Sequence, residues 1–397
     1  IKEDELLGYR RVGNNYLPIP IDMTRASAGT RVNPAGLVET VELLGSELVD
    51  CGNFECAVPL DYWSTGTGWD ISGGVANFDS TGQSTNSLLQ QVVSENIDGI
   101  VNVDFSSGIN TYTFNNGVKT FTLNFTFSKT SGTDRIRVIT SGSTLYFSAL
   151  NGDGLIGSID NVSVKESTKN NLARVDYDGT ASSLLVEPMR TNLIPYSEDY
   201  TSGWISYQAS VTPSQFNALT NTNNATLLYP TISSSYASLF DTDNLTLGIY
   251  TFSVFAKGSG KDFLCIDDTY GGKNWFNLSN GTLGTINSGY TAKIENHGNG
   301  WYKCSVTNNS NITFNYKVIY AVTDADNSLT ITKNGTDGIL LFGSQTELGS
   351  YATSYIPTDG GTVTRVKDQY TKTGISNLIN STEGVLFLEM AALTDDT

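Results

Sequence analysis

The sequence predicts an all-β fold of tandem β-sandwich modules, and three observations carry this prediction. Short segments alternate polar and apolar side chains with the period of two expected of a half-buried strand, as in residues 120–127, 135–139 and 250–255. Asn-Gly dipeptides that favour tight turns separate such segments, as at Asn280-Gly281 and Asn299-Gly300. Strong helix formers do not recur at helical spacing over any long window. Many short strands joined by polar turns are typical of β-sandwiches and jelly rolls.

The composition argues against several classes of function. The chain has 397 residues, a formal net charge of -17 and a single histidine, His297. Nucleic acids and anionic membranes are also negative, so binding to either is disfavoured. One histidine nearly excludes catalytic triads and multi-histidine metal sites, and no carboxylate pair can be assigned the spacing of a glycosidase. No apolar segment approaches the roughly 18 residues of a spanning helix. We therefore expect a protein that is not an enzyme and is not inserted in a membrane.

Comparison of the chain with itself divides it into five segments. Two strand-rich modules each begin with a tryptophan-containing turn and end with a return strand. This similarity is a weak internal repeat of one architecture. Before them, Pro18 and Pro20 lie in an extended apolar segment and disfavour a central strand. The predicted segments are an extended N-terminal attachment segment (1–48), a first jelly-roll module (49–166), a connector (167–191), a second jelly-roll module (192–358) and the start of a further C-terminal domain (359–397).

The four cysteines are too few for a disulfide scaffold. Cys51 and Cys56 can form a bridge only where the backbone turns, because an extended strand would hold their Cα atoms too far apart. Cys265 and Cys304 lie in strand-like segments, where we expect buried free thiols in preference to a disulfide.

Two sequence strings, one at residues 24–38 and one at residues 174–193, carry a resemblance to a known family. Residues 24–33 (TRASAGTRVN) with 36–38 (GLV), and residues 174–179 (RVDYDG) with 184–193 (LLVEPMRTNL), resemble strings in virion appendage proteins of tailed bacteriophages, of the tail-fibre, receptor-binding and head-fibre type. The two strings usually lie closer together in those proteins, so the first module would here be an insertion between them. The resemblance implies a structural protein of a virion, assembled in the host cytoplasm and exposed on the particle surface.

Each module also carries a resemblance of its own. Residues 299–302 and 345–358 are similar to the jelly-roll module that commonly follows the paired strings. The first block, from residue 52 to residue 162, is similar to carbohydrate-binding-module jelly rolls. In those modules a carboxylate near the lead strand and another on the closing strand share a structural calcium ion, which implies Glu55 and Asp160 here. The alternative for Glu55 is a solvated side chain.

Aromatic side chains are the candidates for sugar binding, because sugars stack their C–H-rich faces on flat rings. The candidates are Trp69 with Tyr112 in the first module and Tyr270 with Trp275 in the second. The second pair belongs to a polar loop that could present both rings. The commoner role of such side chains is to cover the core or a subunit contact, and both alternatives stay open.

The sequence therefore favours a protein of a tail or capsid fibre that contributes to adhesion on a host-surface glycan, through many weak contacts and without catalysis. The N-terminal segment would bind other virion proteins. The chain would form a homo-oligomer, for which a trimer is the expectation because phage fibres are often trimers. Two alternatives stay open: the non-catalytic carbohydrate-binding part of a polysaccharide-degrading enzyme, and a bacterial surface adhesin.

Overall fold

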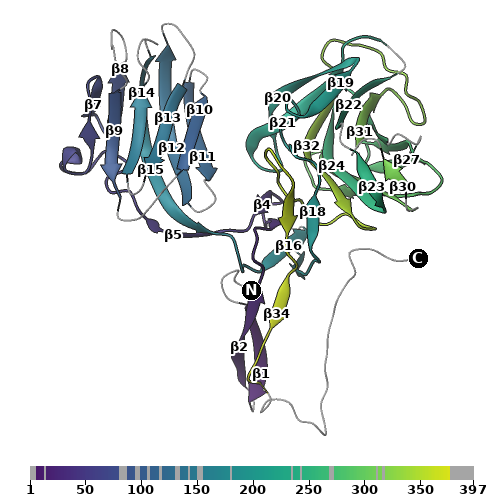
Figure 1. Ribbon diagram of the computed structural model, residues 1–397, viewed down its shortest axis with the longest axis horizontal. Helices are drawn as coiled ribbons and strands as arrows, with labels where there is room; N and C mark the ends of the chain where they lie inside the picture. Colours follow the sequence, from purple (N-terminus) through teal and green to yellow (C-terminus); the bar gives the residue numbers. More distant parts are fainter. Residues whose placement is uncertain are drawn as a thin grey trace. The chain divides into compact units, whose positions relative to one another are not determined.

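A computed structural model gives the fold of most of the chain (Figure 1). It describes residues 6–12, 15–79, 87–93, 99–104, 108–115, 119–129, 135–141, 144–149, 155–178, 181–233, 236–241, 244–267, 272–309, 312–314 and 318–375. Within these residues every regular element is a β-strand except one 3-10 turn, η1 (Pro59–Asp61). The predicted all-β fold is confirmed. The same residues contain no helix with the length and hydropathy of a membrane span.

The chain forms two compact units. The smaller unit is Glu42–Thr168, and the larger unit combines Ile1–Val41 with Lys169–Thr397. The smaller unit is thus inserted into the sequence of the larger one. These limits differ from the predicted segments, because residues 1–41, nearly all of the connector and residues 359–375 belong to the same unit as the second sandwich.

The smaller unit is a β-sandwich of two antiparallel sheets (Figure 1). In spatial order, one sheet contains β10 (Gly99–Asp104), β13 (Arg135–Ser141), β14 (Thr144–Ala149), β9 (Ser87–Val92) and β6 (Ser64–Thr65). The other contains β11 (Gly108–Asn115), β12 (Lys119–Lys129), β15 (Leu155–Thr168), β8 (Val75–Asp79) and β7 (Trp69–Ser72), and β5 (Leu43–Glu47) also pairs with β15. Phe147 from the first sheet and Phe78 from the second share one buried core with Trp63. Burial of these apolar faces is what holds the two sheets together.

The larger unit contains a second β-sandwich. In spatial order, one sheet has β19 (Trp204–Tyr207), β22 (Ala237–Asp241), β31 (Ile319–Thr323), β25 (Phe263–Asp267), β26 (Asn274–Asn277) and β27 (Thr282–Ile286). The other has β20 (Ala209–Asn217), β21 (Thr222–Pro230), β32 (Gly338–Leu348), β24 (Tyr250–Ser259), β29 (Tyr302–Asn308) and β28 (Tyr290–Asn296). Leu264, Phe276 and Tyr320 of the first sheet meet Phe252 and Leu341 of the second in one core. A pair of short strands, β23 (Leu245–Gly248) and β30 (Ile312–Phe314), completes the sandwich, and its jelly-roll topology stays a prediction.

Two local predictions about this sandwich are confirmed. Cys265 and Cys304 are buried free thiols. The Asn299-Gly300 dipeptide lies between β28 and β29, where both residues have positive φ (53° and 77°). Asn and Gly are the residues that adopt this conformation most readily, so the sequence favours the turn locally.

Short sheets outside the sandwich also belong to the larger unit, and two of them pair strands that lie far apart in the sequence. They are β1 (Leu6–Val12) with β2 (Asn15–Thr24) and β34 (Gln369–Thr371), β3 (Thr30–Val32) with β4 (Val38–Thr40), β16 (Arg174–Asp178) with β17 (Ala181–Leu185), and β18 (Arg190–Asn192) with β33 (Val363–Arg365). Among the described residues, β2 pairs with β34 at residues 22–24, and its half with Pro18 and Pro20 pairs with β1 alone. This agrees with the expectation that the prolines disfavour a central strand.

Five buried charged side chains join these segments, and each is at most 7% exposed. Asp368 accepts from Arg25 Nη1 at 2.8 Å and also from Arg174 Nη2. Glu187 Oε2 lies 2.8 Å from Arg174 Nη1 and 3.0 Å from Arg365 Nη1. We call these five residues the arginine–carboxylate network. Its members come from the strings at residues 24–33 and 174–193 and from residues 365–368, which lie far apart in the sequence.

Backbone hydrogen bonds run alongside the arginine–carboxylate network. The amide of Asn171 donates to the carbonyl of Arg25 at 2.9 Å, and the Asn171 side chain accepts from the Arg25 amide at 2.9 Å. The amide of Asp368 donates to the carbonyl of Glu187 at 3.0 Å, while the Glu187 amide donates to the Asp368 carboxylate at 2.9 Å. Arg25 precedes the inserted unit and Asn171 follows it. The chain is therefore fastened on both sides of the insertion, within the larger unit.

We expect Arg174→Ala to destabilise the larger unit by about 3–5 kcal/mol. The reason is that Arg174 pairs with both Glu187 and Asp368, and its removal takes a positive charge away from each of these buried carboxylates. Urea unfolding followed by tryptophan fluorescence measures this cost. The matched control is Arg31→Ala: Arg31 pairs at 2.8 Å with Glu39, and because the two side chains are 12% and 37% exposed, we expect a smaller cost than for the fully buried network. Equal costs for the two variants would show that the network does not hold the unit together.

Candidate functional site

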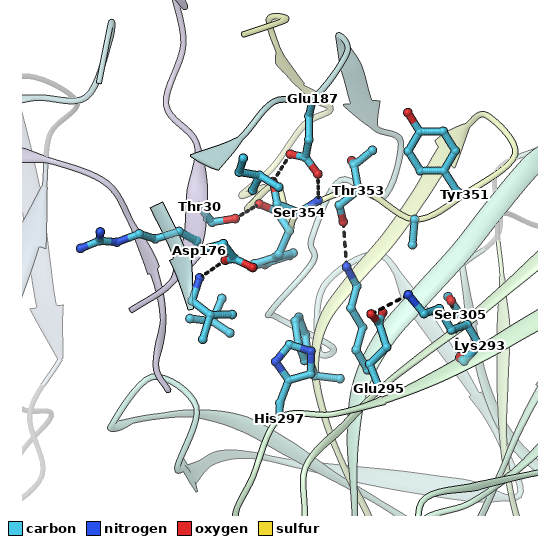
Figure 2. Close-up of a pocket in the computed structure, with 18 of the residues that line it drawn as sticks. Thr30, Asp176, Glu187, Lys293, Glu295, His297, Ser305, Tyr351, Thr353 and Ser354 are labelled. Atoms are coloured by element: carbon cyan, nitrogen blue, oxygen red, sulfur yellow. Dashed lines mark hydrogen bonds and ion pairs between the residues drawn. The ribbon is translucent and has the colours of Figure 1, made fainter. Parts of the chain in front are cut away.

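A pocket of about 430 Å³ lies in the larger unit (Figure 2). Its lining comes from strands β28 and β29, from residues 350–355, and from the segments around Thr30 and Asp176. These segments include the ones that the arginine–carboxylate network fastens together. The same network therefore shapes one wall of the pocket.

The alternation of side chains in two neighbouring strands creates the polar wall of the pocket. In β28 the residues Thr291, Lys293 and Glu295 lie on one face, since they are spaced by two. Strand β29 contributes Lys303, Ser305 and Thr307 in the same way. In the register of the two strands, Glu295 lies opposite Lys303, Lys293 opposite Ser305 and Thr291 opposite Thr307. The intervening side chains, among them Ile294, Cys304 and Val306, pack on or in the core of the sandwich.

The segment that follows β32 covers part of this polar face. The hydroxyl of Thr251 donates to the carbonyl of Gly349 at 2.9 Å, and Lys303 Nζ donates to the carbonyl of Thr353 at 2.7 Å. The Glu347 carboxylate accepts from the amide and the hydroxyl of Thr353 at 2.8 and 2.7 Å. Part of a polar sheet face is thus buried with hydrogen bonds to the segment that covers it, which lowers the cost of burying polar groups.

A pair of opposite charges belongs to the pocket lining. Lys293 Nζ is 2.9 Å from Glu295 Oε1. Burial by itself would raise the pKa of Glu295, but Lys303 and Lys293 together hold this pKa below its ordinary value. Glu295 is therefore an ionised hydrogen-bond acceptor at neutral pH. Lys303 is only 9% exposed, and Phe255 lies under its ammonium group with the ring centre 5.8 Å away.

The opposite side of the pocket carries Asp176 and the hydroxyl groups of Thr30 and Ser354 (Figure 2). Asp176 Oδ1 accepts from the Val32 amide at 2.6 Å. Burial raises the pKa of Asp176, and the nearby charge of Glu187 adds to this effect. Glu187 differs, because burial would raise its pKa while Arg365 and Arg174 bring it below the ordinary value. The two carboxyl groups thus have different environments, although both lie at the same wall.

His297 and Tyr351 complete the lining. The His297 ring is half-buried, with its centre 5.1 Å from that of Phe255 in an edge-on contact. The Arg190 guanidinium lies 5.3 Å from the centre of the Tyr351 ring, on one of its two faces. This contact fixes the plane of an aromatic ring that lines the pocket.

The aromatic residues proposed from the sequence do not form this site. Trp69 is 7% exposed and packs against Phe78 with ring centres 5.0 Å apart, as a member of the core of the smaller unit. Trp275 is 5% exposed, and its indole N–H donates to the carbonyl of Ser328 at 3.3 Å. Neither ring offers a flat face to a sugar, so the alternative of core packing holds for both. The side chains of Tyr112 and Tyr270 lie outside the described residues.

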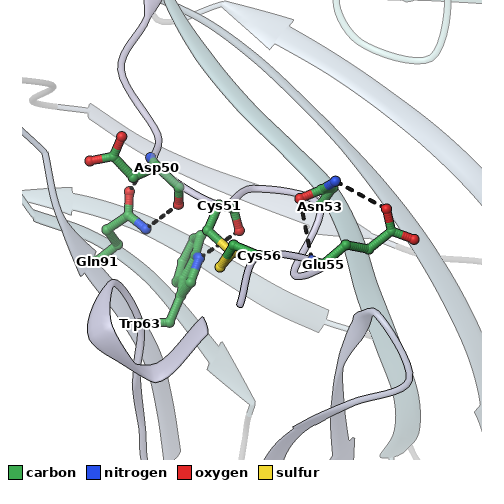
Figure 3. The surroundings of a disulfide bond; sticks show 7 residues. All are labelled: Asp50, Cys51, Asn53, Glu55, Cys56, Trp63 and Gln91. Atoms are coloured by element: carbon green, nitrogen blue, oxygen red, sulfur yellow. Dashed lines mark hydrogen bonds between the residues drawn. A yellow bond between two sulfur atoms is a disulfide. The ribbon is translucent and has the colours of Figure 1, made fainter. Parts of the chain in front are cut away.

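In the smaller unit, Cys51 and Cys56 form a disulfide bond with their Cα atoms 5.7 Å apart (Figure 3). The backbone turns there, since the amide of Phe54 donates to the carbonyl of Cys51 at 3.1 Å and both residues have positive φ. The turn required by the sequence argument is thus present. The indole N–H of the buried Trp63 donates to the same carbonyl at 3.0 Å, which ties the disulfide to the core.

The two carboxylates proposed for calcium lie apart from any larger group of ligands. Glu55 is exposed and accepts from the side chain of Asn53 at 3.2 Å (Figure 3). Both oxygens of Asp160 accept from Asn161, one from its amide at 2.6 Å and one from its side chain at 2.8 Å. Over the described part of the chain, no three His, Cys, Asp or Glu side chains gather as metal ligands. The residues present do not fit a calcium ion without further ligands, and the calcium site stays a prediction of the resemblance alone.

No family model matches the chain, and no curated protein matches it. The function must therefore be inferred from the geometry and from the strings that carry the resemblance.

Sequence reasoning missed the residues that line the pocket, among them Glu295, Lys303 and Tyr351. The alternation that places Glu295 and Lys303 on one face is visible in the sequence, and it predicts the strands. A polar face, however, is normally the solvent face of a sandwich. Only the return of residues 349–358 across it turns this face into a pocket, and no local pattern predicts that return.

We expect the stabilising effect of Glu295 to depend on pH. The unfolded pKa of a glutamate is about 4.3, and the folded pKa of Glu295 is lower. Ionised Glu295 therefore stabilises the fold above that value, and this contribution is lost as the pH falls through the folded pKa. Urea unfolding should show a larger stability difference between wild type and Glu295→Gln at pH 6 than at pH 3. Thr291→Ala is the control, since threonine does not titrate, and a Glu295→Gln difference that is equally independent of pH would contradict the assignment.

Proposed function

We propose that the chain is a structural, non-catalytic protein of a tailed-phage virion, part of a tail or capsid fibre, and that it contributes to adhesion on a host-surface glycan. The first β-sandwich would be an inserted module that adds surface to the appendage. The N-terminal segment would bind other virion proteins, and the chain would act as a homo-oligomer, so that several weak contacts combine into firm attachment.

The arginine–carboxylate network is the observation that supports this proposal most. Arg25 belongs to the first string that resembles phage appendage proteins, and Arg174 and Glu187 belong to the second. The two strings are in contact through Asp368, although an inserted unit of more than a hundred residues separates them in the sequence. A pair of strings that folds together in this way has a structural reason to occur together, and this supports the relevance of the resemblance.

The all-β architecture and the pocket support a role in adhesion. A sandwich unit whose segments are fastened by buried charges is stiff, and stiffness suits a protein that displays a binding surface. The pocket offers hydroxyl groups, a carboxylate, an ammonium group and an aromatic ring, which are the groups that bind carbohydrates.

A bacterial surface adhesin is the second candidate, and the disulfide favours it. Disulfides persist in oxidising surroundings such as the cell surface and the periplasm. The Cys51–Cys56 bond fits such a protein directly, whereas a virion protein would acquire the bond after release from the host cell.

Mass spectrometry of purified particles separates the two candidates. Particles of the virus whose genome encodes the chain are purified on a density gradient and digested, and we expect peptides of the chain at many copies per particle. Peptides of the chain in a bacterial cell-envelope fraction, and none in the particles, would contradict the virion assignment and favour the adhesin.

A further inference from the structure

We propose that the pocket of the larger unit binds an uncharged saccharide, of roughly one or two sugar rings, through Lys303, Glu295 and Tyr351. This inference rests on the proposed adhesive function and gives it a site. It also moves the sugar site away from Trp69 and Trp275, whose rings are buried.

The size of the pocket fits such a ligand. Small-molecule sites usually measure about 300–1,000 Å³, and the pocket at about 430 Å³ lies at the lower end of this range. Its lining mixes hydroxyl-bearing side chains with apolar ones, including Val32, Val38 and Ala292. A sugar ring has the matching surface, with hydroxyl groups at its rim and C–H groups on its faces.

The charges in the lining favour an uncharged ligand because they balance in number, with three basic side chains (Arg31, Lys293, Lys303) and three carboxylates (Asp176, Glu187, Glu295). Lys293 is paired with Glu295 at 2.9 Å, and Arg31 with Glu39 at 2.8 Å. Lys303 lies opposite Glu295 in the register of β28 and β29 and lowers the pKa of that carboxyl group. A charged ligand would enter a pocket without a net excess of the opposite charge and would lose its hydration.

Paired charges are nevertheless good partners for a hydroxyl group, which donates one hydrogen bond and accepts others. The ionised Glu295 can accept the hydroxyl proton while the Lys303 ammonium donates to the oxygen. Among the described residues, the Thr353 carbonyl takes one of the three N–H donors of Lys303, so donors remain for a ligand. Thr353 also positions this ammonium group before a ligand arrives, which lowers the entropy cost of binding.

Tyr351 provides the aromatic surface. Arg190 covers one face of its ring at 5.3 Å, and Tyr351 belongs to the pocket lining, so we assign the other face to stacking on a sugar. Arg190 also lies 3.7 Å from the buried Glu347, so the ring is supported by a charge that is itself held in place. The stacking surface is thus ordered in advance.

Titration calorimetry on the full chain tests the proposal. The probes are neutral disaccharides of hexoses and N-acetylhexosamines, with uronic-acid disaccharides of similar size as the charged comparison. We expect at least one neutral disaccharide to bind, and to bind more tightly than every charged one. The absence of binding by any neutral probe, or tighter binding of a uronic-acid disaccharide, would overturn the proposal.

Variants locate the binding. We expect Tyr351→Ala and Lys303→Met each to weaken the neutral disaccharide at least tenfold. The controls are Tyr207→Ala on the exposed side of β19 and Lys333→Met on an exposed loop, which lie outside the lining and should bind as wild type does. Tyr351 is half-exposed, so its variant tests the site even if Lys303→Met fails to fold. Unchanged affinity in Tyr351→Ala would overturn the assignment.

The disaccharide-binding test and the mass-spectrometry test of the virion assignment can fail separately. Loss of disaccharide binding in the pocket variants, together with absence of the chain from virus particles, would leave the pocket assigned and the proposed function wrong. Peptides of the chain in virus particles, together with unchanged binding in the variants, would leave the proposed function standing and place the sugar elsewhere.

Discussion

The buried pairing of Arg25, Arg174 and Arg365 with Glu187 and Asp368 is the interaction on which the larger unit depends. It joins the chain before the insertion, the chain after it and the segment that follows the second sandwich. Such a network is costly to leave half-made, because removing one partner exposes another charge to a medium of low polarity. The same cost makes the arrangement specific, since only a chain with all three segments in place gives each of these charges a partner of opposite sign. An inserted sandwich can therefore interrupt the sequence without interrupting the fold.

The pocket is a consequence of the same arrangement. The polar face of strands β28 and β29 would be an ordinary solvent face, but residues 349–358 return across it and are fastened to Glu187 through Ser354, whose amide donates to the carboxylate at 2.8 Å. The charged rows of the sheet are then partly buried, with Lys303 held by the Thr353 carbonyl. The arginine–carboxylate network and the pocket share one wall. The network therefore holds the residues of that wall in fixed positions.

The sequence predicts the strands well, because strand periodicity and Asn-Gly turns are local properties, and Asn299-Gly300 adopts the turn it predicts. It also marks the strings that form the network, although their physical reason becomes clear only in three dimensions. A Cβ atom at Gly29 would lie 2.8 Å from Arg174 Cδ, for example, so glycine is needed there for close approach. The domain limits and the aromatic sites were harder to predict, because the partners of Arg365 and Asp368 lie more than a hundred residues away and because burial of Trp69 and Trp275 depends on the whole sandwich. The pocket requires the return of a distant segment, which no local pattern encodes.

Hydrogen exchange of the intact protein tests most directly whether the segments around the insertion form one folded unit. The amides of Asn171, Glu187 and Asp368 donate hydrogen bonds within the network region. If that region is part of the cooperative core, these amides exchange as slowly as those of β24 and β32, at the rate set by global unfolding. Fast exchange at these three amides, beside slow exchange in the two strands, would show that the network is a local contact and would contradict the account.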